Sequence, residues 1–114
     1  MRTDRLFLGD IVEAIDEVIS TTPPTRAEFD ANKLVQSHVI RNIQIIGEAV
    51  SRLSNGLKDA HPAVPWRQIV GMRHAIVHDY FDVDWDEVYR TAINDIPPLK
   101  SQIEAILASL PPDP

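Results

Sequence analysis

Basic, imidazole and phenolic side chains gather in one short stretch of this 114-residue chain. The stretch contains Arg73, His74, His78, Asp79 and Tyr80. An imidazole changes its charge near neutral pH and can take up or release a proton. A guanidinium stays protonated and pairs with phosphate or carboxylate groups through two parallel hydrogen bonds. These residue types can therefore combine acid–base chemistry with the binding of an anion.

The position of Arg73 within its expected helix is unusual. A helix over residues 66–79, at about 100° per residue, places Arg73 inside a broad apolar arc made of Ile69, Val70, Met72, Ile76, Val77 and Tyr80. Because a guanidinium cannot lose its proton, one on an inward face must meet anions, carbonyl groups, a partner chain or a wet cavity. Gly71 in the middle of this helix predicts a bend or a close approach by another backbone.

The spacing of three of these residues belongs to a longer pattern. The motif consists of Arg73, then His78 after four intervening residues, then Tyr80 after one more. It follows the segment Pro65–Met72, and the segment Ile45–Ala49 lies further upstream. Over about residues 11–107 the chain resembles the HepT-like toxins of the HEPN superfamily. The resemblance implies an all-α, compact bundle of about four to six helices that forms a symmetric dimer, with two copies of the motif meeting in one cleft.

The resemblance also implies an activity. Arg73 and His78 match the catalytic pair of an endoribonuclease that uses no metal and no other cofactor, in a type VII-like toxin-antitoxin system. Tyr80 matches the tyrosine that an MntA-like minimal nucleotidyltransferase antitoxin adenylylates. RNA is then the expected substrate, with tRNA and mRNA as candidate classes.

These roles agree with what RNA cleavage requires. Without a metal, the reaction needs a base for the 2′-hydroxyl proton, an acid for the leaving 5′-oxygen and positive charge at the phosphate. Arg73 and His78 can meet these needs. A nucleotide on Tyr80, two residues from His78, would add bulk and negative charge that compete with the RNA phosphate.

Several residues keep more than one interpretation. Tyr80 could simply complete the apolar face, with its hydroxyl bonded to a neighbour. His74 occupies a position where the family often has a small polar residue such as Asn. With His78 and Asp79 it could hold a transition metal, but the sequence fixes no further ligand, so we expect no metal. Glu48 is either solvated or pairs with Arg73 and orients it.

Two other functions remain open for the whole chain. It could be a non-catalytic helical subunit that recruits or positions the nucleotidyltransferase and holds a nucleotide in the motif cleft. It could also be a helical dimerisation domain without chemistry, which would leave the placement of Arg73 unexplained.

Composition narrows the possible partners. A net charge of -6 argues against RNA binding through a general basic surface, so any RNA contact should be local, with Arg41, Arg52 and Arg67 as candidates. The absence of cysteine excludes disulfides and thiolate chemistry and suits a reducing cytoplasm. The sequence shows no signal peptide and no membrane span, so we expect a cytoplasmic protein. We expect one domain over residues 1–110 and a frayed tail over 111–114.

Hydrophobic spacing predicts helices in the N-terminal half. The first runs over residues 4–20, with Thr3 or Asp4 as its N-cap. The second runs over 26–53, opens with a capping box at Thr25 and has a possible break near 29–32. Its core arc is Val35, Val39, Ile43, Ile46, Val50 and Leu53, widened by Leu34, Ile45 and Ala49. His38 and Asn42 interrupt this arc, and we expect them to bond to each other or to a backbone carbonyl.

Capping and proline signals divide the C-terminal half. Asn55-Gly56 predicts a left-handed C-cap, residues 57–65 a connector, and Trp66 the anchor of the motif helix. Asp84 predicts the N-cap of a last helix that continues to about residue 110. Pro97-Pro98 predicts a kink in that helix or two abutting helices. No segment predicts a β-strand.

Overall fold

The structure is a computed structural model that describes residues 3–76 and 82–112, with only the backbone described at residues 73–75. The described residues contain no β-strand, which confirms the all-α prediction. They form seven α-helices and one π-helical segment: α1 (Asp4–Thr21), α2 (Arg26–Asp30), α3 (Lys33–Ser51), α4 (Asn55–Ala60), α5 (Trp66–Ile76), α6 (Trp85–Arg90), η1 (Thr91–Asp95) and α7 (Pro97–Ser109).

Short polar side chains cap the first helices where the sequence predicts it. The Thr3 hydroxyl accepts a hydrogen bond from the backbone N–H of Leu6, and the Thr25 hydroxyl accepts one from Glu28. Asn32 Oδ1 accepts bonds from both Leu34 N–H and Val35 N–H at 3.1 Å, so a new helix begins there. The predicted break between α2 and α3 is therefore confirmed.

The predicted C-cap at Asn55-Gly56 is wrong, because these residues begin α4 instead. The Ser54 hydroxyl accepts from Leu57 N–H, and Ser54 itself donates to the Asp4 carboxylate from its N–H at 2.8 Å and from its Oγ at 2.6 Å. No described glycine has a positive φ, so no left-handed cap forms at Gly56. The N-cap restarts a helix where the sequence suggested a connector, and α4 is thus the helix that the sequence analysis missed.

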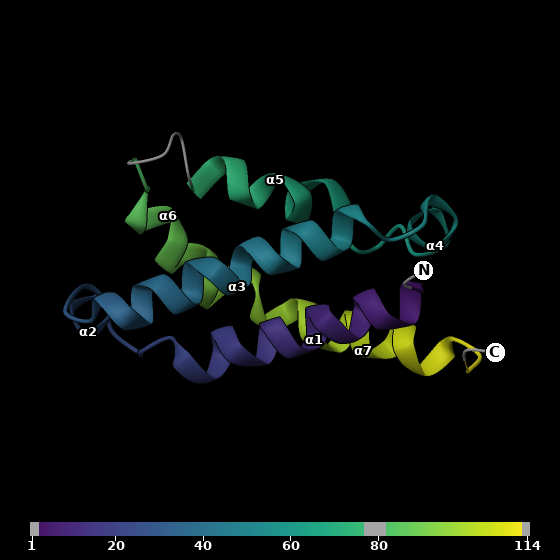
Figure 1. Cartoon of the computed structure of the whole chain (residues 1–114), viewed down its shortest axis with the longest axis horizontal. Coiled ribbons are helices and arrows are strands. Elements are labelled where there is room, and N and C mark those ends of the chain that lie inside the picture. The colour runs from purple at the N-terminus through teal and green to yellow at the C-terminus, as the bar shows by residue number, and fades with distance from the viewer. Residues whose placement is uncertain (1–2, 77–81, 113–114) are drawn as a thin grey trace.

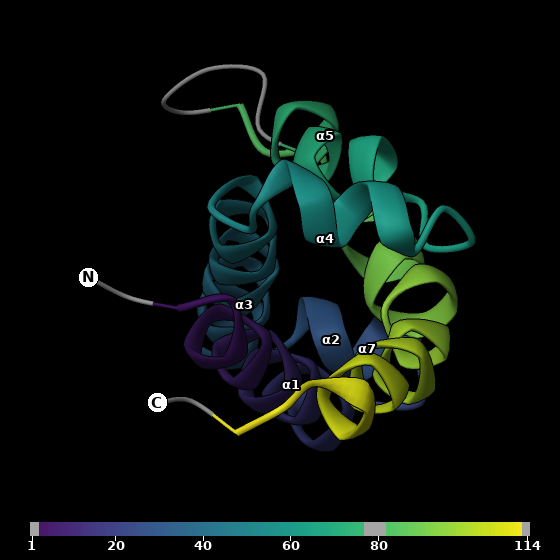
Figure 2. The same cartoon turned by 90° about the vertical axis from the view of Figure 1, so that its right-hand side faces the viewer.

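α1, α3, α5 and the stretch from α6 to α7 run in alternating directions along the long axis of the molecule (Figure 1). α1 and α3 pack against each other, α5 lies on α3, and α7 lies on α1. The two chain ends lie at the same end of the molecule (Figure 1), and the view along the long axis shows the helices surrounding a shared centre (Figure 2). The molecule measures 46 × 26 × 26 Å.

The core forms one cluster along the inner faces of these helices. Val39, Ile43, Ile46 and Val50 of α3 are fully buried, as their spacing predicts. Leu34 is 83% exposed, so its assignment to the core arc is wrong. The reason is its register: Leu34 precedes Val39 by five residues, which places it roughly 140° around the helix from the buried face.

The two polar residues on the inner side of α3 satisfy each other, as expected. Asn42 is buried, and its Nδ2 donates to the backbone carbonyl of His38 at 2.8 Å and lies 3.3 Å from His38 Nε2. The same His38 nitrogen lies 2.8 Å from Glu17 Oε2 on α1. These contacts link α3 to α1 at the edge of the core.

The last predicted helix is divided into α6, η1 and α7, which confirms the predicted interruption at Pro97-Pro98. Proline has no N–H to donate, so the carbonyls one turn earlier lose their usual helical partners. Instead, Ile96 N–H bonds to the carbonyl of Thr91 at 3.0 Å, five residues back, as in a π-helix. Among the described residues, none of the helices combines the length and apolar composition needed to cross a bilayer.

Candidate active site and the adjoining groove

Helix α5 carries the first part of the motif and is fixed at its start by Trp66. The indole Nε1 donates to the carbonyls of Lys58 at 3.1 Å and His61 at 3.0 Å, both at the end of α4. This confirms the anchoring role predicted for Trp66. Further along α5, Ile69 is 2% exposed and Ile76 is fully buried, so this helix is held to the core at both ends.

The backbone of Arg73 and His74 lies in the last turn of α5. Arg73 follows Ile69 by four residues and Val70 by three within this helix, so its backbone has the register that the sequence predicts. The side chains of Arg73 and His74 lie outside the described part of the chain. His78, Asp79 and Tyr80 also lie outside the described residues, and their roles stay predictions.

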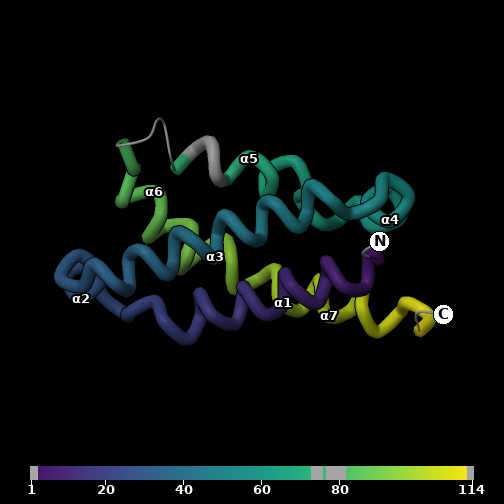
Figure 3. Tube along the Cα trace, in the orientation of Figure 1, coloured from purple at the N-terminus to yellow at the C-terminus, as the bar shows by residue number. Residues whose placement is uncertain are grey.

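A backbone hydrogen bond marks the two ends of the segment that contains His78 and Tyr80. Asp84 N–H donates to the carbonyl of Ile76 at 2.9 Å, which joins the end of α5 to the start of α6. Figure 3 shows α5 lying along α3. Asp84 also caps α6, because its Oδ1 accepts from Glu87 N–H at 3.1 Å, as predicted. Ile76 and Asp84 therefore lie side by side.

Of the residues proposed to assist the motif, Glu48 lies on α3. Glu48 is 46% exposed, and its Oε1 accepts a hydrogen bond from Arg52 Nε at 3.0 Å, one turn along α3. Its pairing with Arg73 involves a side chain outside the described residues and stays a prediction. Arg41 and Arg67 are exposed, as is Arg52. In the described residues no group of three His, Asp or Glu side chains is placed to hold a metal ion.

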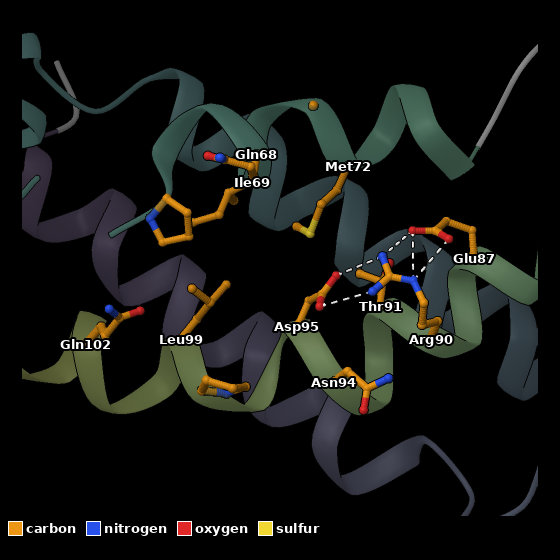
Figure 4. Close-up of a pocket in the computed structure, with 13 residues that line it drawn as sticks. Gln68, Ile69, Met72, Glu87, Arg90, Thr91, Asn94, Asp95, Leu99 and Gln102 are labelled. Atoms are coloured by element: carbon orange, nitrogen blue, oxygen red, sulfur yellow. Dashed lines mark hydrogen bonds and ion pairs between the residues drawn. The ribbon is translucent and has the colours of Figure 1, made fainter. Parts of the chain in front are cut away.

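A groove of about 670 Å³ lies along another face of α5 (Figure 4). Four elements line it: Pro65, Gln68, Ile69, Gly71 and Met72 of α5 and its N-terminal flank; Glu87, Arg90, Thr91, Asn94 and Asp95 of α6 and η1; and Pro98, Leu99 and Gln102 of α7. A Cβ added at Gly71 would meet no described atom within 4 Å. Of the two alternatives expected at Gly71, the close approach by another backbone is therefore not found among the described residues, and the bend stays a prediction. Gly71 borders open space in the groove.

Arg90 is held in the wall of the groove by two carboxylates. Its Nε lies 3.1 Å from both Glu87 oxygens, and its Nη atoms contact Asp95 at 3.1 and 3.3 Å (Figure 4). These hydrogen bonds raise the pKa of Arg90 and lower the pKa of Glu87. Asp95 lies five residues after Arg90 and reaches it because the intervening turn is π-helical. The sequence pattern does not reveal this wall of the groove, because an ordinary α-helix would place Asp95 about 140° around the helix from Arg90.

Comparison with known proteins identifies the family. The chain matches the family model "Ribonuclease HepT-like" over residues 11–106. "Probable ribonuclease HepT" of Thermococcus cleftensis is 39% identical over 106 residues, which cover 92% of this chain and 96% of that protein. "Putative RNase MJ0125" of Methanocaldococcus jannaschii is 36% identical over 110 residues, 96% of this chain and 95% of that protein. No solved structure matches the chain. The family match and these relatives show that the chain belongs to the HepT-like family of the HEPN superfamily.

Proposed function

We propose that this protein is a metal-independent endoribonuclease of the toxin type that acts on RNA in the cytoplasm. The observation that carries the proposal is the match to the HepT-like family over residues 11–106, which includes the complete Arg73, His78 and Tyr80 motif. Relatives that are 34–39% identical bear ribonuclease names. The placement of the Arg73 backbone in the last turn of α5, next to segment 77–83, supports a site formed at this end of the helix.

In the proposed mechanism Arg73 neutralises the phosphate and His78 transfers protons. Arg73 keeps its charge at every working pH and can donate two hydrogen bonds to phosphate oxygens. His78 takes the proton from the 2′-hydroxyl or gives one to the leaving 5′-oxygen. In a symmetric dimer two copies of His78 would meet in one cleft, so one can act as the base and the other as the acid.

The proposed control acts on the same cleft. A minimal nucleotidyltransferase of the MntA type would attach an adenylyl group to Tyr80, two residues from His78. The attached phosphate brings negative charge and the nucleotide brings bulk, and both oppose the entry of RNA. His74, Asp79 and Glu48 are proposed as auxiliary residues that orient this pair or adjust its charge.

Cleavage by two single variants tests the assignment. Freshly purified protein should cut members of a panel of tRNA and mRNA in the presence of EDTA, and Arg73→Ala and His78→Ala should each abolish cleavage. His61→Ala is a matched control, because the described contacts of His61 use its backbone at the end of α4. The intact mass of each sample must exclude adenylylation, and circular dichroism must show that the variants are folded. Retained cleavage by folded His78→Ala would overturn the assignment.

The proposed dimer is tested by sedimentation equilibrium of the active sample. The expected mass is twice the 12.8 kDa of one chain. An active monomer would contradict the shared cleft. If the unmodified wild type leaves every RNA intact but binds a nucleotidyltransferase, the chain is the non-catalytic subunit considered above.

A further inference from the structure

The groove beside α5 has the size and lining of a ligand site. Its volume of about 670 Å³ lies within the range of roughly 300–1,000 Å³ typical of ligand pockets. It borders Gly71 and Met72, which directly precede Arg73, yet it faces α6, η1 and α7, whereas α3 packs elsewhere on α5. The groove is therefore lined by the part of α5 that directly precedes the motif.

The base of the groove is apolar and could bind the flat face of a ring. Ile69 and Leu99 are buried at 2% and 4% exposure, and the Met72 side chain projects between them and η1 (Figure 4). Methionine is flexible and polarisable, so it adapts well to the face of an aromatic ring. A planar ring placed here would cover the apolar side chains and leave its polar edge toward η1.

The rim offers unused hydrogen-bonding groups. Gln68 and Asn94 make no side-chain hydrogen bond to another described residue. Gln102 donates one side-chain N–H to the carbonyl of Ala63 at 3.4 Å, so its own side-chain carbonyl remains available as an acceptor. A carboxamide has both donors and acceptors, and such groups recognise the edges of nucleobases.

Charge disfavours a phosphate in this groove and favours a ligand with N–H donors. Arg90 uses its Nε and both Nη atoms on Glu87 and Asp95, so its charge is already balanced, and the three residues together carry a net charge of -1. Each Asp95 oxygen accepts from Arg90 and keeps a second lone pair, and these two remaining lone pairs point away from each other. Asp95 lies across the groove from Met72 (Figure 4), so one of its oxygens can accept from a ligand that lies against Met72.

We propose that the groove binds one nucleobase of the RNA substrate, and that guanine fits it best. Guanine presents an N1–H and an exocyclic amine side by side, and one oxygen of Asp95, at its free lone pair, can accept from both. The base would lie against Met72, with the rim carboxamides at its remaining edges. The inference rests on the proposed ribonuclease function. A helix with its side chains is about 10–12 Å across, so the bound base lies within a few nucleotides of a phosphate held at Arg73.

Nucleoside binding tests the groove without any need for cleavage. Guanosine added to isotope-labelled wild-type protein should shift the NMR signals of Gly71 and the Met72 methyl group, and inosine, which lacks the 2-amino group, should bind at least about fivefold more weakly. Asp95→Asn should reduce guanosine affinity by about tenfold or more, since it replaces an acceptor by a donor. Asp16→Asn is the matched control, because Asp16 also pairs with a basic side chain, Lys100 at 2.8 Å, but lies outside the groove.

RNA cleavage supplies the second measurement. In an RNA cut by the wild type, replacing the bound guanine by inosine should raise KM with little change in kcat, and Met72→Trp, which fills the groove, should remove that difference. If the RNA is cut but guanosine shifts no groove signal and Asp95→Asn behaves like Asp16→Asn, the groove proposal is wrong while the ribonuclease stands. If no RNA is cut but guanosine still binds through Asp95, the proposed catalysis fails and the base site remains. A groove occupied only by a protein partner would give neither nucleoside effect.

Discussion

At the scale of single residues, Glu87 and Asp95 hold the Arg90 guanidinium in place and balance its charge. The guanidinium is half-exposed at 50%, and it is held because one carboxylate lies a turn before it and the other lies across the π-helical turn. The hydrogen bond from Arg90 is the main cause that lowers the pKa of Glu87 below its ordinary value of 4.5. Protonation of Glu87 therefore works against the folded state.

Stability at acid pH should depend on Glu87. A carboxyl group whose pKa is lowered by folding stabilises the protein above its unfolded pKa, near 4.5, and loses that contribution as the pH falls through the folded pKa. The destabilisation caused by Glu87→Gln should thus be largest at neutral pH and shrink below about pH 4.5, as measured by urea unfolding from pH 7 to pH 3. Glu13→Gln, at an exposed glutamate of α1, is the control. An equal effect of Glu87→Gln at every pH would contradict the ion pair.

Contacts between residues that are close in the sequence were predictable. Thr3, Thr25 and Asp84 cap helices as expected, because a cap depends on a backbone N–H two or three residues away. The contact of Arg90 with Asp95 was not predictable, because it depends on a π-helical turn that the sequence pattern does not reveal. The side chains of the motif itself belong to the undescribed part of the chain, so their geometry stays a prediction.

At the scale of elements, α3 is the central helix, and Asn32 sets where it starts. α3 contacts both α1 and α5, the helix that carries the motif. Most of its buried face followed from the apolar spacing. The separate helix α4 did not, because its cap Ser54 is itself held by Asp4, fifty residues away. Contacts so distant in sequence cannot be deduced from local patterns.

Loss of the Asn32 cap should weaken the whole domain. Asn32→Ala leaves the N–H groups of Leu34 and Val35 without their acceptor, at an expected cost of about 1 kcal/mol in the free energy of unfolding. Asn55→Ala makes the same chemical change at the exposed first residue of α4, where the cap is Ser54, and should cost much less. Chemical denaturation measures the free energy of unfolding of both variants and of the wild type. Equal stability losses would show that the Asn32 cap contributes nothing specific.

At the scale of the whole molecule, the acidic charge restricts how RNA can bind. A net charge of -6 repels a polyanion except where cations are concentrated. If the proposed dimer brings two copies of Arg73 into one cleft, these two guanidinium groups supply the principal phosphate contacts. Hydrophobic spacing predicted most of the helices, and the resemblance to the HepT-like family implied that they form a compact bundle. The association of two chains depends on which surface is buried between them, and a single sequence does not show this.

RNA affinity should therefore depend only weakly on salt. Two phosphate contacts predict a slope of log K against log salt of about -1.4 for a single strand, at roughly -0.7 per contact. The measurement uses folded, cleavage-deficient His78→Ala protein and a labelled RNA at several salt concentrations. A slope of about -4 or steeper would indicate six or more contacts and an extended basic surface that the composition argues against.

The most direct measurement of the central claim is the chemistry of the ends of the RNA products. Unmodified wild-type protein, with its intact mass confirmed, is incubated with RNA in EDTA, and the products are analysed by mass spectrometry. Attack by the 2′-hydroxyl, assisted by His78 and Arg73, predicts a 2′,3′-cyclic phosphate on one product and a 5′-hydroxyl on the other. Cleavage that needs a divalent metal ion and leaves a 3′-hydroxyl and a 5′-phosphate would contradict the account.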